Sequence, residues 1–420
     1  MSASVTVRQL APEQDVSFDC PHCDTGLRTT GWRMPGMRVL ASLECPACQR
    51  TYFGDYPAGD GYFGQALLER DTGEVHADRD DFFTKWLRES WAARSSEPVD
   101  VEWTTHREID EPVVLNCLDT MYGHCLRKLF YAQYHVDEDD RDLVVIVPAN
   151  LAWMVPDGAA AVWAVDLPLG RGTEWNDWLA DQFESRLSEY GSVAVSCNRP
   201  FPINVDVDIE RFTGVEPFPL DEWESRSADP TVTFVWRDDR QWSRFPPTTI
   251  LYDWLGGRTA RWVVENPVMA RAGDVLDSVN RRIQQRRVIE LASEIRSLSP
   301  GVEFAVAGLG ASGGLPDWIA DERVSSPTTS DERRLCQRYA GSQVVIGVHG
   351  SNMLLPSAHA PVTIDLMPSR RWGNLEQDLL SRHVDSRETG FHYHLLPLDT
   401  EPARVADLAS AVLDAEHRFD

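Results

Sequence analysis

The sequence predicts an α/β protein made of two helix-covered parallel-sheet units, preceded by a small module built around cysteine pairs. Short apolar runs alternate with helical patterns along residues 110–370, which is typical of parallel strands joined by crossover helices. This rhythm stops at a polar stretch, residues 221–230, and then restarts. In addition, 420 residues are too many for one ordinary hydrophobic core.

The composition fits a folded chain and excludes several classes of protein. Hydrophobic residues make up 42% and the formal net charge is −26. A surface this acidic repels nucleic acid and anionic lipid, so we expect neither as a partner. The most apolar region, residues 143–169, is broken by prolines and acids and predicts no membrane span. The start of the chain has no export signal, and with paired cysteines this favours a reducing cytoplasm.

The motifs CPHC and CPAC form two matched CxxC pairs in residues 16–56. Two such turns supply four thiolates to one tetrahedral zinc ion, whereas disulfides or a redox pair fit less well without an export signal. Four thiolates leave no open coordination position, so the zinc is expected to be structural, and His22 inside the first turn is not needed. We therefore predict a zinc ribbon over residues 1–60. Its ligands are Cys20, Cys23, Cys45 and Cys48.

A helical linker and the first α/β unit are expected to follow the ribbon. Helical spacing over residues 80–94 places a helix in the linker, residues 61–104. The first unit covers residues 105–228. Its strands are predicted at residues 113–118, 143–147, 161–165 and 193–196, and its helices at 125–134 and 175–190.

The second α/β unit is predicted over residues 229–420. We expect Ser330 to cap a helix over 331–340, and a closing helix over 401–419 to pack back across the domains. Strands are predicted at residues 232–236, 302–307, 344–348 and 362–366, with a long arginine-rich helix at 274–298.

The run Arg237-Asp238-Asp239-Arg240 directly follows the first strand of the second unit. Ligands of parallel α/β sheets collect outside the carboxyl ends of strands. Two guanidinium groups at such a place suit a diphosphate. On these four residues alone, however, a solvated turn with local Arg–Asp pairing is the better interpretation.

A second strand of the same unit is followed by the turn His349-Gly350-Ser351-Asn352. This second turn favours a phosphate site over a solvated surface turn. Gly347 and Gly350 allow a close backbone approach, and the helix expected next would present free N–H groups to phosphate. The side chains of the last two residues of the turn add donors. Two candidate anion-binding strand ends in one unit predict a phosphate site.

The segment GVHGSNMLLPSAHAPVTIDLMP, residues 347–368, resembles the C-terminal hallmark of family 61 glycosyltransferases, roughly GxHGAGLxNxLFxxPGxxVIExxP. The preceding DERRLCQRYAGSQVVIG resembles the helix and strand that lead into this motif. TFVWRDDRQW resembles the arginine turn of the nucleotide-sugar half, and YGHCL resembles the YYHWLL helix start of the other half. The resemblance covers about residues 110–370 and excludes the ribbon.

This resemblance implies a GT-B architecture, in which two Rossmann-like domains bind an acceptor (residues 105–228) and a nucleotide-sugar donor (residues 229–420). The implied reaction is an inverting, metal-independent transfer of a sugar to an unidentified acceptor hydroxyl. The donor-binding residues implied are Arg237, Arg240, His349, Gly350, Ser351, Asn352 and Asp365, the last of which stands where the family often has Glu.

The residues expected to carry the chemistry are His124 and Asp119, at a strand-to-helix junction of the first unit. His124 is either a general base for the acceptor hydroxyl or a buried structural imidazole. Asp119 either orients it or is itself the base. Arg127 and Lys128 stand where the family has an acid. This departure supports the alternative function, a noncatalytic adaptor that keeps the fold and uses the ribbon to recognise a partner.

Overall fold

The computed structural model describes residues 4–8, 17–55, 66–77, 82–138, 140–196, 207–226, 229–243, 267–369, 371–373, 380 and 392–414. The chain divides into two compact units, Met1–Val205 and Asp206–Asp420. The division lies upstream of the expected boundary at 228/229. The reason is that Phe218, before the polar stretch, and Trp223, within it, are both buried in the core of the second unit.

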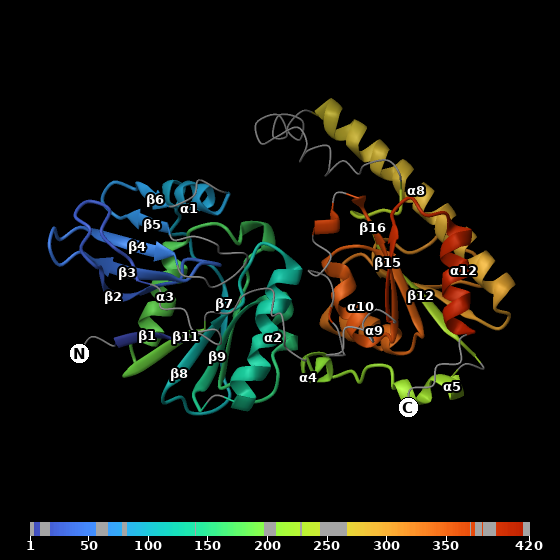
Figure 1. The fold of residues 1–420 in the computed structure, drawn as a ribbon, viewed down its shortest axis with the longest axis horizontal. Helices are drawn as coiled ribbons and strands as arrows, with labels where there is room; N and C mark the ends of the chain where they lie inside the picture. The colour runs from blue at the N-terminus through green and yellow to red at the C-terminus, as the bar shows by residue number, and fades with distance from the viewer. Residues whose placement is uncertain are drawn as a thin grey trace. The chain divides into compact units, whose positions relative to one another are not determined.

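A six-stranded sheet forms the centre of the first unit, in the order β1-β11-β8-β9-β10-β7 (Figure 1). All neighbours are parallel except β7, which runs antiparallel to β10. The predicted parallel sheet is therefore present, with one antiparallel edge. Its strands are β1 (Ser4–Arg8), β7 (Val101–Thr105), β8 (Pro112–Asn116), β9 (Asp142–Pro148), β10 (Ala161–Val165) and β11 (Ser192–Ser196).

Two helices lie beside this sheet, α2 (Tyr122–Glu138) and α3 (Asp177–Leu187). α2 packs against β8 and β9, and α3 begins where the Asn176 side chain accepts a hydrogen bond from the Leu179 amide. β8 is buried along its whole length. The residues directly after it, where the chain turns into α2, therefore lie at the carboxyl edge of the sheet.

The cysteine-rich module is an antiparallel sheet in the order β2-β3-β4-β5-β6, with α1 (Phe82–Ala92) packed on β5 and β6. It follows β1 and shares a core with the six-stranded sheet, because Phe18 and Trp32 lie in one buried cluster with Val114. The module is thus inserted after the first strand of the α/β unit. Its strands are β2 (Arg28–Arg33), β3 (Leu40–Glu44), β4 (Thr51–Asp55), β5 (Ala66–Glu69) and β6 (Val75–Ala77).

The sheet of the second unit is parallel throughout and has the order β14-β13-β12-β15-β16-β17. Numbered along the chain, this is the 3-2-1-4-5-6 order of the Rossmann fold, whose direction of winding switches between the first and fourth strands. These are β12 and β15. The strands are β12 (Thr231–Arg237), β13 (Glu303–Leu309), β14 (Ala320–Val324), β15 (Val344–Val348), β16 (Val362–Met367) and β17 (Tyr393–Pro397).

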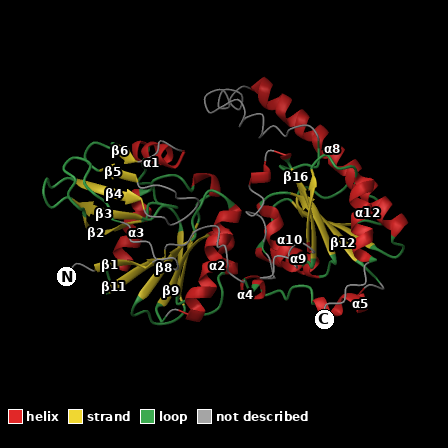
Figure 2. Cartoon of the chain, in the orientation of Figure 1, coloured by secondary structure: helices red, strands yellow, loops and turns green. Residues whose placement is uncertain are grey.

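Helices α8 (Pro267–Leu298), α9 (Thr329–Ala340) and α12 (Pro402–Leu413) accompany this sheet (Figure 2). The closing helix α12 packs along α8 within the second unit, where Val405 and Ile295 share a core. The N-cap of α9 is Thr328, not Ser330. Thr328 and Asp331 exchange side-chain-to-backbone hydrogen bonds in a capping box, which starts the helix earlier.

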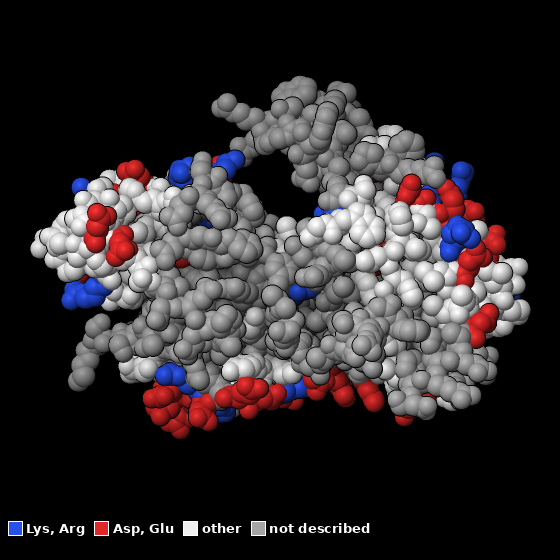
Figure 3. Space-filling model, in the orientation of Figure 1, with Lys and Arg blue, Asp and Glu red and all other residues white. Residues whose placement is uncertain are grey.

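Acidic side chains predominate over basic ones on the described part of the surface that Figure 3 shows, in agreement with the net charge of −26. Among the described residues, none of the helices combines the length and the apolar character needed to cross a membrane.

Candidate functional site

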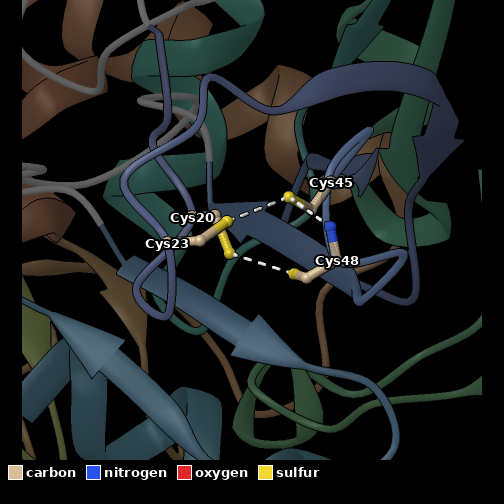
Figure 4. A group of neighbouring side chains, drawn as sticks. All are labelled: Cys20, Cys23, Cys45 and Cys48. Carbon is tan, nitrogen blue, oxygen red and sulfur yellow. Dashed lines mark hydrogen bonds between the residues drawn. The ribbon is translucent and has the colours of Figure 1, made fainter.

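The four cysteine side chains of the inserted module point toward one another (Figure 4). Sγ of Cys20 lies 3.6 Å from Sγ of Cys48, and Sγ of Cys23 lies 3.5 Å from Sγ of Cys45. Two zinc–sulfur bonds of about 2.3 Å at a tetrahedral angle separate the sulfurs by about 3.8 Å. All four sulfurs lie within 4.8 Å of one another, so the donor set fits one tetrahedral zinc ion.

The two CxxC turns have the same local structure. In the first, the amide of Asp24 donates to the carbonyl of Cys20, and in the second the amide of Gln49 donates to the carbonyl of Cys45, both at 2.9 Å. Asp24 and Gln49 have positive φ angles of 53° and 61°. This left-handed residue after the second cysteine turns the chain back, and so it aims both sulfurs of a pair at the same point.

The surroundings of Cys20 favour the thiolate that zinc requires. Burial raises the pKa of the Cys20 thiol, but the Tyr52 hydroxyl, 3.4 Å from its sulfur, and neighbouring amide and thiol groups bring that pKa down to about 6. Chemically, the four-cysteine centre can hold a structural metal ion. It leaves no position at which a substrate could bind.

In the second unit, the structure brings Arg240 onto the turn that follows β15. The Arg240 guanidinium donates to the carbonyl of His349 at 2.9 Å. A Cβ atom added at Gly350 would lie 1.3 Å from Nη1 of Arg240, so only glycine leaves room for the guanidinium. A positive charge is thus fixed where the carboxyl ends of β12 and β15 meet. This is the switch point, at which Rossmann-type sheets bind their ligands.

Arg237 has a different environment from Arg240. Its guanidinium makes a two-pronged contact with Asp239, at 2.7 and 2.5 Å. Burial raises the pKa of Asp239, but the guanidinium beside it lowers that pKa below its usual range. For this arginine the local Arg–Asp pairing weighed in the sequence analysis is present, so its charge is already balanced.

The turn after β15 differs in two ways from the expected glycine-rich helix start. Gly347 makes room for Met353, whose sulfur would lie 2.3 Å from an added Cβ, so this glycine serves packing rather than ligand approach. The turn continues into a 3-10 segment, Ser351–Met353, and the six-residue helix α10 (Leu354–His359). Such a short helix has a weak dipole, so Arg240 supplies most of the positive charge here.

His349 and Asp365 form a buried pair beneath this turn. The imidazole Nδ1 lies 2.6 Å from a carboxylate oxygen of Asp365, which also accepts a hydrogen bond from the Tyr393 hydroxyl at 2.6 Å. Both members of the pair are almost completely buried. They hold β15, β16 and β17 together below the turn, while Ser351 and Asn352 are partly exposed.

In the first unit, Asp119 and His124 lie together just beyond the carboxyl end of β8. Nδ1 of His124 is 3.2 Å from one carboxylate oxygen of Asp119, and Nζ of Lys128 is 2.7 Å from the other. Burial alone would raise the pKa of Asp119, but the Lys128 ammonium and the His124 ring lower it well below its usual range. Asp119 therefore stays ionised and orients His124.

Lys128 is the residue that sequence reasoning undervalued, because it was noted only as a departure from the family pattern. A signal was present in the sequence. Lys85 and Lys128 are the chain's two lysines, and Lys128 stands in the apolar helical run CLRKLFYA. A fully buried lysine requires a partner, and Asp119 is the carboxylate nine residues earlier.

The comparisons with known proteins give only distant similarities. No protein-family model matches the chain. No curated protein matches it either. Among solved structures, the chain is similar to E. coli heptosyltransferase WaaC with ADP, with 11% identity over 73% of this chain and 99% of that one and a TM-score of 0.37.

Two further solved structures are similar to this chain. For NodZ α-1,6-fucosyltransferase soaked with GDP-fucose, the identity is 11%, the coverage 61% of this chain and 95% of that one, and the TM-score 0.31. For the GtfA/B complex, the identity is 10%, the coverage 97% and 76%, and the TM-score 0.25. These TM-scores are too low to establish a shared fold, so function has to be argued from the site residues.

Proposed function

We propose that this protein is a nucleotide-sugar-dependent glycosyltransferase. Its second unit would bind the diphosphate of the donor at the carboxyl ends of β12 and β15, and its first unit would supply His124 as the base for the acceptor hydroxyl. The observation that carries the proposal is the position of Arg240. This cation is seated on the Gly350 turn at the switch point of a 3-2-1-4-5-6 sheet.

On the donor side, Arg240 offers paired N–H donors to phosphate oxygens. As the bond between the sugar and the diphosphate breaks, negative charge grows on the departing phosphate, and a preorganised cation lowers the energy of that state. Ser351 and Asn352 add donors at the same turn. The buried pair His349 and Asp365 acts as a positioning group, because it fixes the turn against which Arg240 rests.

On the acceptor side, the neutral tautomer of His124 with its proton on Nδ1 donates to Asp119 and carries its lone pair on Nε2. Nε2 takes the proton of the acceptor hydroxyl, the oxygen bonds to the anomeric carbon, and the nucleoside diphosphate leaves with the electrons of the broken bond. Attack opposite to the leaving group inverts the anomeric centre. Because Arg240 supplies the positive charge, we expect transfer without added divalent cations.

A noncatalytic adaptor with the same fold is the second candidate function. It is favoured by one observation. The buried cluster of Asp119, His124 and Lys128 also has the form of a purely structural network, because Asp119 lies 3.2 Å from the His124 ring and 2.7 Å from the Lys128 ammonium. The adaptor would use the ribbon to contact its partner and would turn over no nucleotide sugar.

The test of the donor site is calorimetric titration of the full chain with UDP, GDP and ADP. Arg240→Ala should lose about 1.5–3 kcal/mol of binding free energy for the nucleotide that binds best, because a hydrogen bond to a charged group is removed. That is a loss of roughly 10- to 150-fold in affinity. Arg334→Ala is the matched control, since this arginine pairs with Asp331 on the exposed side of α9.

A second variant keeps the result interpretable if Arg240→Ala changes the fold. Gly350→Ala places a methyl group where the Arg240 guanidinium lies and should reproduce the loss, whereas Gly373→Ala, with open space around its added Cβ, should not. Equal nucleotide affinity in the wild type, Arg240→Ala and Gly350→Ala would contradict the proposed site. It would also be contradicted if none of the three nucleotides bound to the wild type.

A further inference from the structure

Three potential metal ligands converge in the inserted module, beside the four-cysteine centre. His22 lies within the first CxxC turn, Glu69 is the last residue of β5, and His76 lies on β6. β5 and β6 are hydrogen-bonded neighbours at the edge of the module's sheet. One ligand atom from each of the three residues lies within 4.8 Å of the other two.

The distances in this His–Glu–His cluster fit ligands of a common metal ion better than direct hydrogen bonds. Nε2 of His22 lies 3.4 Å from Oε2 of Glu69, and Nε2 of His76 lies 3.7 Å from the same oxygen. Good N–H···O bonds span about 2.7–3.2 Å. Two ligands bound tetrahedrally at about 2.0–2.1 Å are separated by about 3.4 Å.

Both Glu69 and His76 present buried polar atoms to this point. Glu69 is 1% exposed. Its Oε1 is held by Arg50, while Oε2 faces the imidazoles and accepts a hydrogen bond from Thr72 at 3.2 Å. Nε2 of His76 is buried and has no hydrogen-bond partner among the residues that the structure describes. A buried nitrogen without a partner is costly, and a metal ion would satisfy it.

The charge around the cluster also favours a cation. Four thiolates around one Zn²⁺ leave two negative charges, and Glu69 adds a third, of which Arg50 balances one. A second divalent ion would neutralise the remaining negative charge.

We propose that His22, Glu69 and His76 form a second metal site, distinct from the four-cysteine centre. Two imidazoles and one carboxylate form an open ligand set that accepts Zn²⁺ and its spectroscopic substitute Co²⁺, whereas four thiolates form a closed site. Three protein ligands leave a fourth position to water. The His22 imidazole, which the four-cysteine shell does not need, thereby acquires a role.

The experiment uses the full chain, purified with its zinc, and follows Co²⁺ titration by visible absorption and Zn²⁺ content by elemental analysis. The wild type should bind one added Co²⁺ with ligand-field bands and without the charge-transfer band of a thiolate–cobalt bond. When saturated with Zn²⁺ it should hold two ions per chain. His76→Ala and His22→Ala should each remove the added ion and leave one zinc. His106→Ala, an exposed histidine of the same unit, is the control.

Glu69→Gln tests the carboxylate, but it also removes the charge partner of Arg50 and can weaken the fold. The two histidine variants, checked by circular dichroism and thermal melting, therefore decide the matter. The proposal is overturned if zinc-saturated wild type holds one ion per chain. It is also overturned if His22→Ala and His76→Ala bind the second ion as the wild type does, or if added Co²⁺ shows the thiolate band, since the metal would then occupy the cysteines.

Discussion

Burial raises the pKa of the Asp119 carboxyl in the first unit, but the ammonium of Lys128 lowers it below its usual range. Lys128 is fully buried, and its ammonium lies against the Asp119 carboxylate and the Leu118 carbonyl. A buried charge is tolerated only when it is paired, so Asp119 and Lys128 each require the other. A carboxylate stabilised in its ionised form is a weak base, so we propose that Asp119 orients His124 and that His124 takes the proton.

We expect Asp119→Asn to lower the free energy of unfolding by about 3–5 kcal/mol at neutral pH, because Lys128 would keep a buried charge without a counterion. The pKa of Asp119 is lower in the folded than in the unfolded chain. Its contribution is therefore complete above the unfolded pKa of about 3.9 and is lost as the pH falls through the lowered folded value.

Urea denaturation from pH 7 down to pH 3 measures this effect. The stability gap between wild type and Asp119→Asn should be constant near neutrality and narrow below about pH 4. Asp157→Asn, in an exposed turn, serves as the control and should show no gap. A gap that is absent at pH 7, or that widens on acidification, would contradict the ionised buried pair.

Residue types and positions in the sequence predicted part of the candidate site. The arginine run, the His349 turn and the junction of Asp119 with His124 were placed at strand ends from the sequence. The different roles of Arg237 and Arg240 were not predictable, since they depend on which guanidinium reaches Asp239 and which reaches the carbonyl of His349. Such a distinction needs the register between β12 and β15.

Whether a strand could be predicted from the sequence depended on its position in the sheet, central or at the edge. The central strands of both sheets are buried on both faces and read as apolar runs. In these two sheets, the four strands that the sequence analysis missed, β1, β7, β14 and β17, are all edge strands. Edge strands carry polar residues, as in ADERV of β14 and VEWTT of β7, and so they lack the signal.

The cysteine-rich module is continuous with the first α/β unit, so we expect the loss of a zinc ion bound by its cysteines to affect the whole unit. Cys20 and Cys45 share a buried cluster with Val114 of β8 and Phe183 of α3. Cys45→Ser combined with Cys48→Ser should lower the zinc content by one equivalent per chain. Because metal-binding free energy contributes to folding, this variant should also lower the melting temperature of the whole first unit.

Differential scanning calorimetry with elemental analysis checks this expectation. Cys48→His is the matched control, since zinc accepts an imidazole in place of a thiolate and the ion should be retained. The transition of the second unit, which has its own core, should be unchanged. An unaltered melting profile of the first unit after loss of the zinc would show that the module is energetically independent of the sheet.

In the whole molecule, the candidate residues of both units lie at corresponding places in their sheets. Each has a parallel sheet, and in each the candidate residues lie beyond the carboxyl end of a central strand, β8 in the first unit and β12 with β15 in the second. This is where α/β sheets bind ligands. The inserted module has an antiparallel sheet instead, and its four clustered cysteines have the geometry to hold a metal ion.

We propose that His124 is the base of a sugar transfer for which the second unit binds the donor. The role of His124 is tested by comparing wild type and His124→Ala in the release of nucleoside diphosphate from the best-binding nucleotide sugar, without added divalent cations. Donor affinity and melting temperature are measured on the same preparations. We expect turnover to be lower by about 10²–10⁴-fold in His124→Ala, with donor affinity and melting temperature close to wild type. Unchanged turnover, or a loss of donor affinity and melting temperature together with turnover, would contradict it.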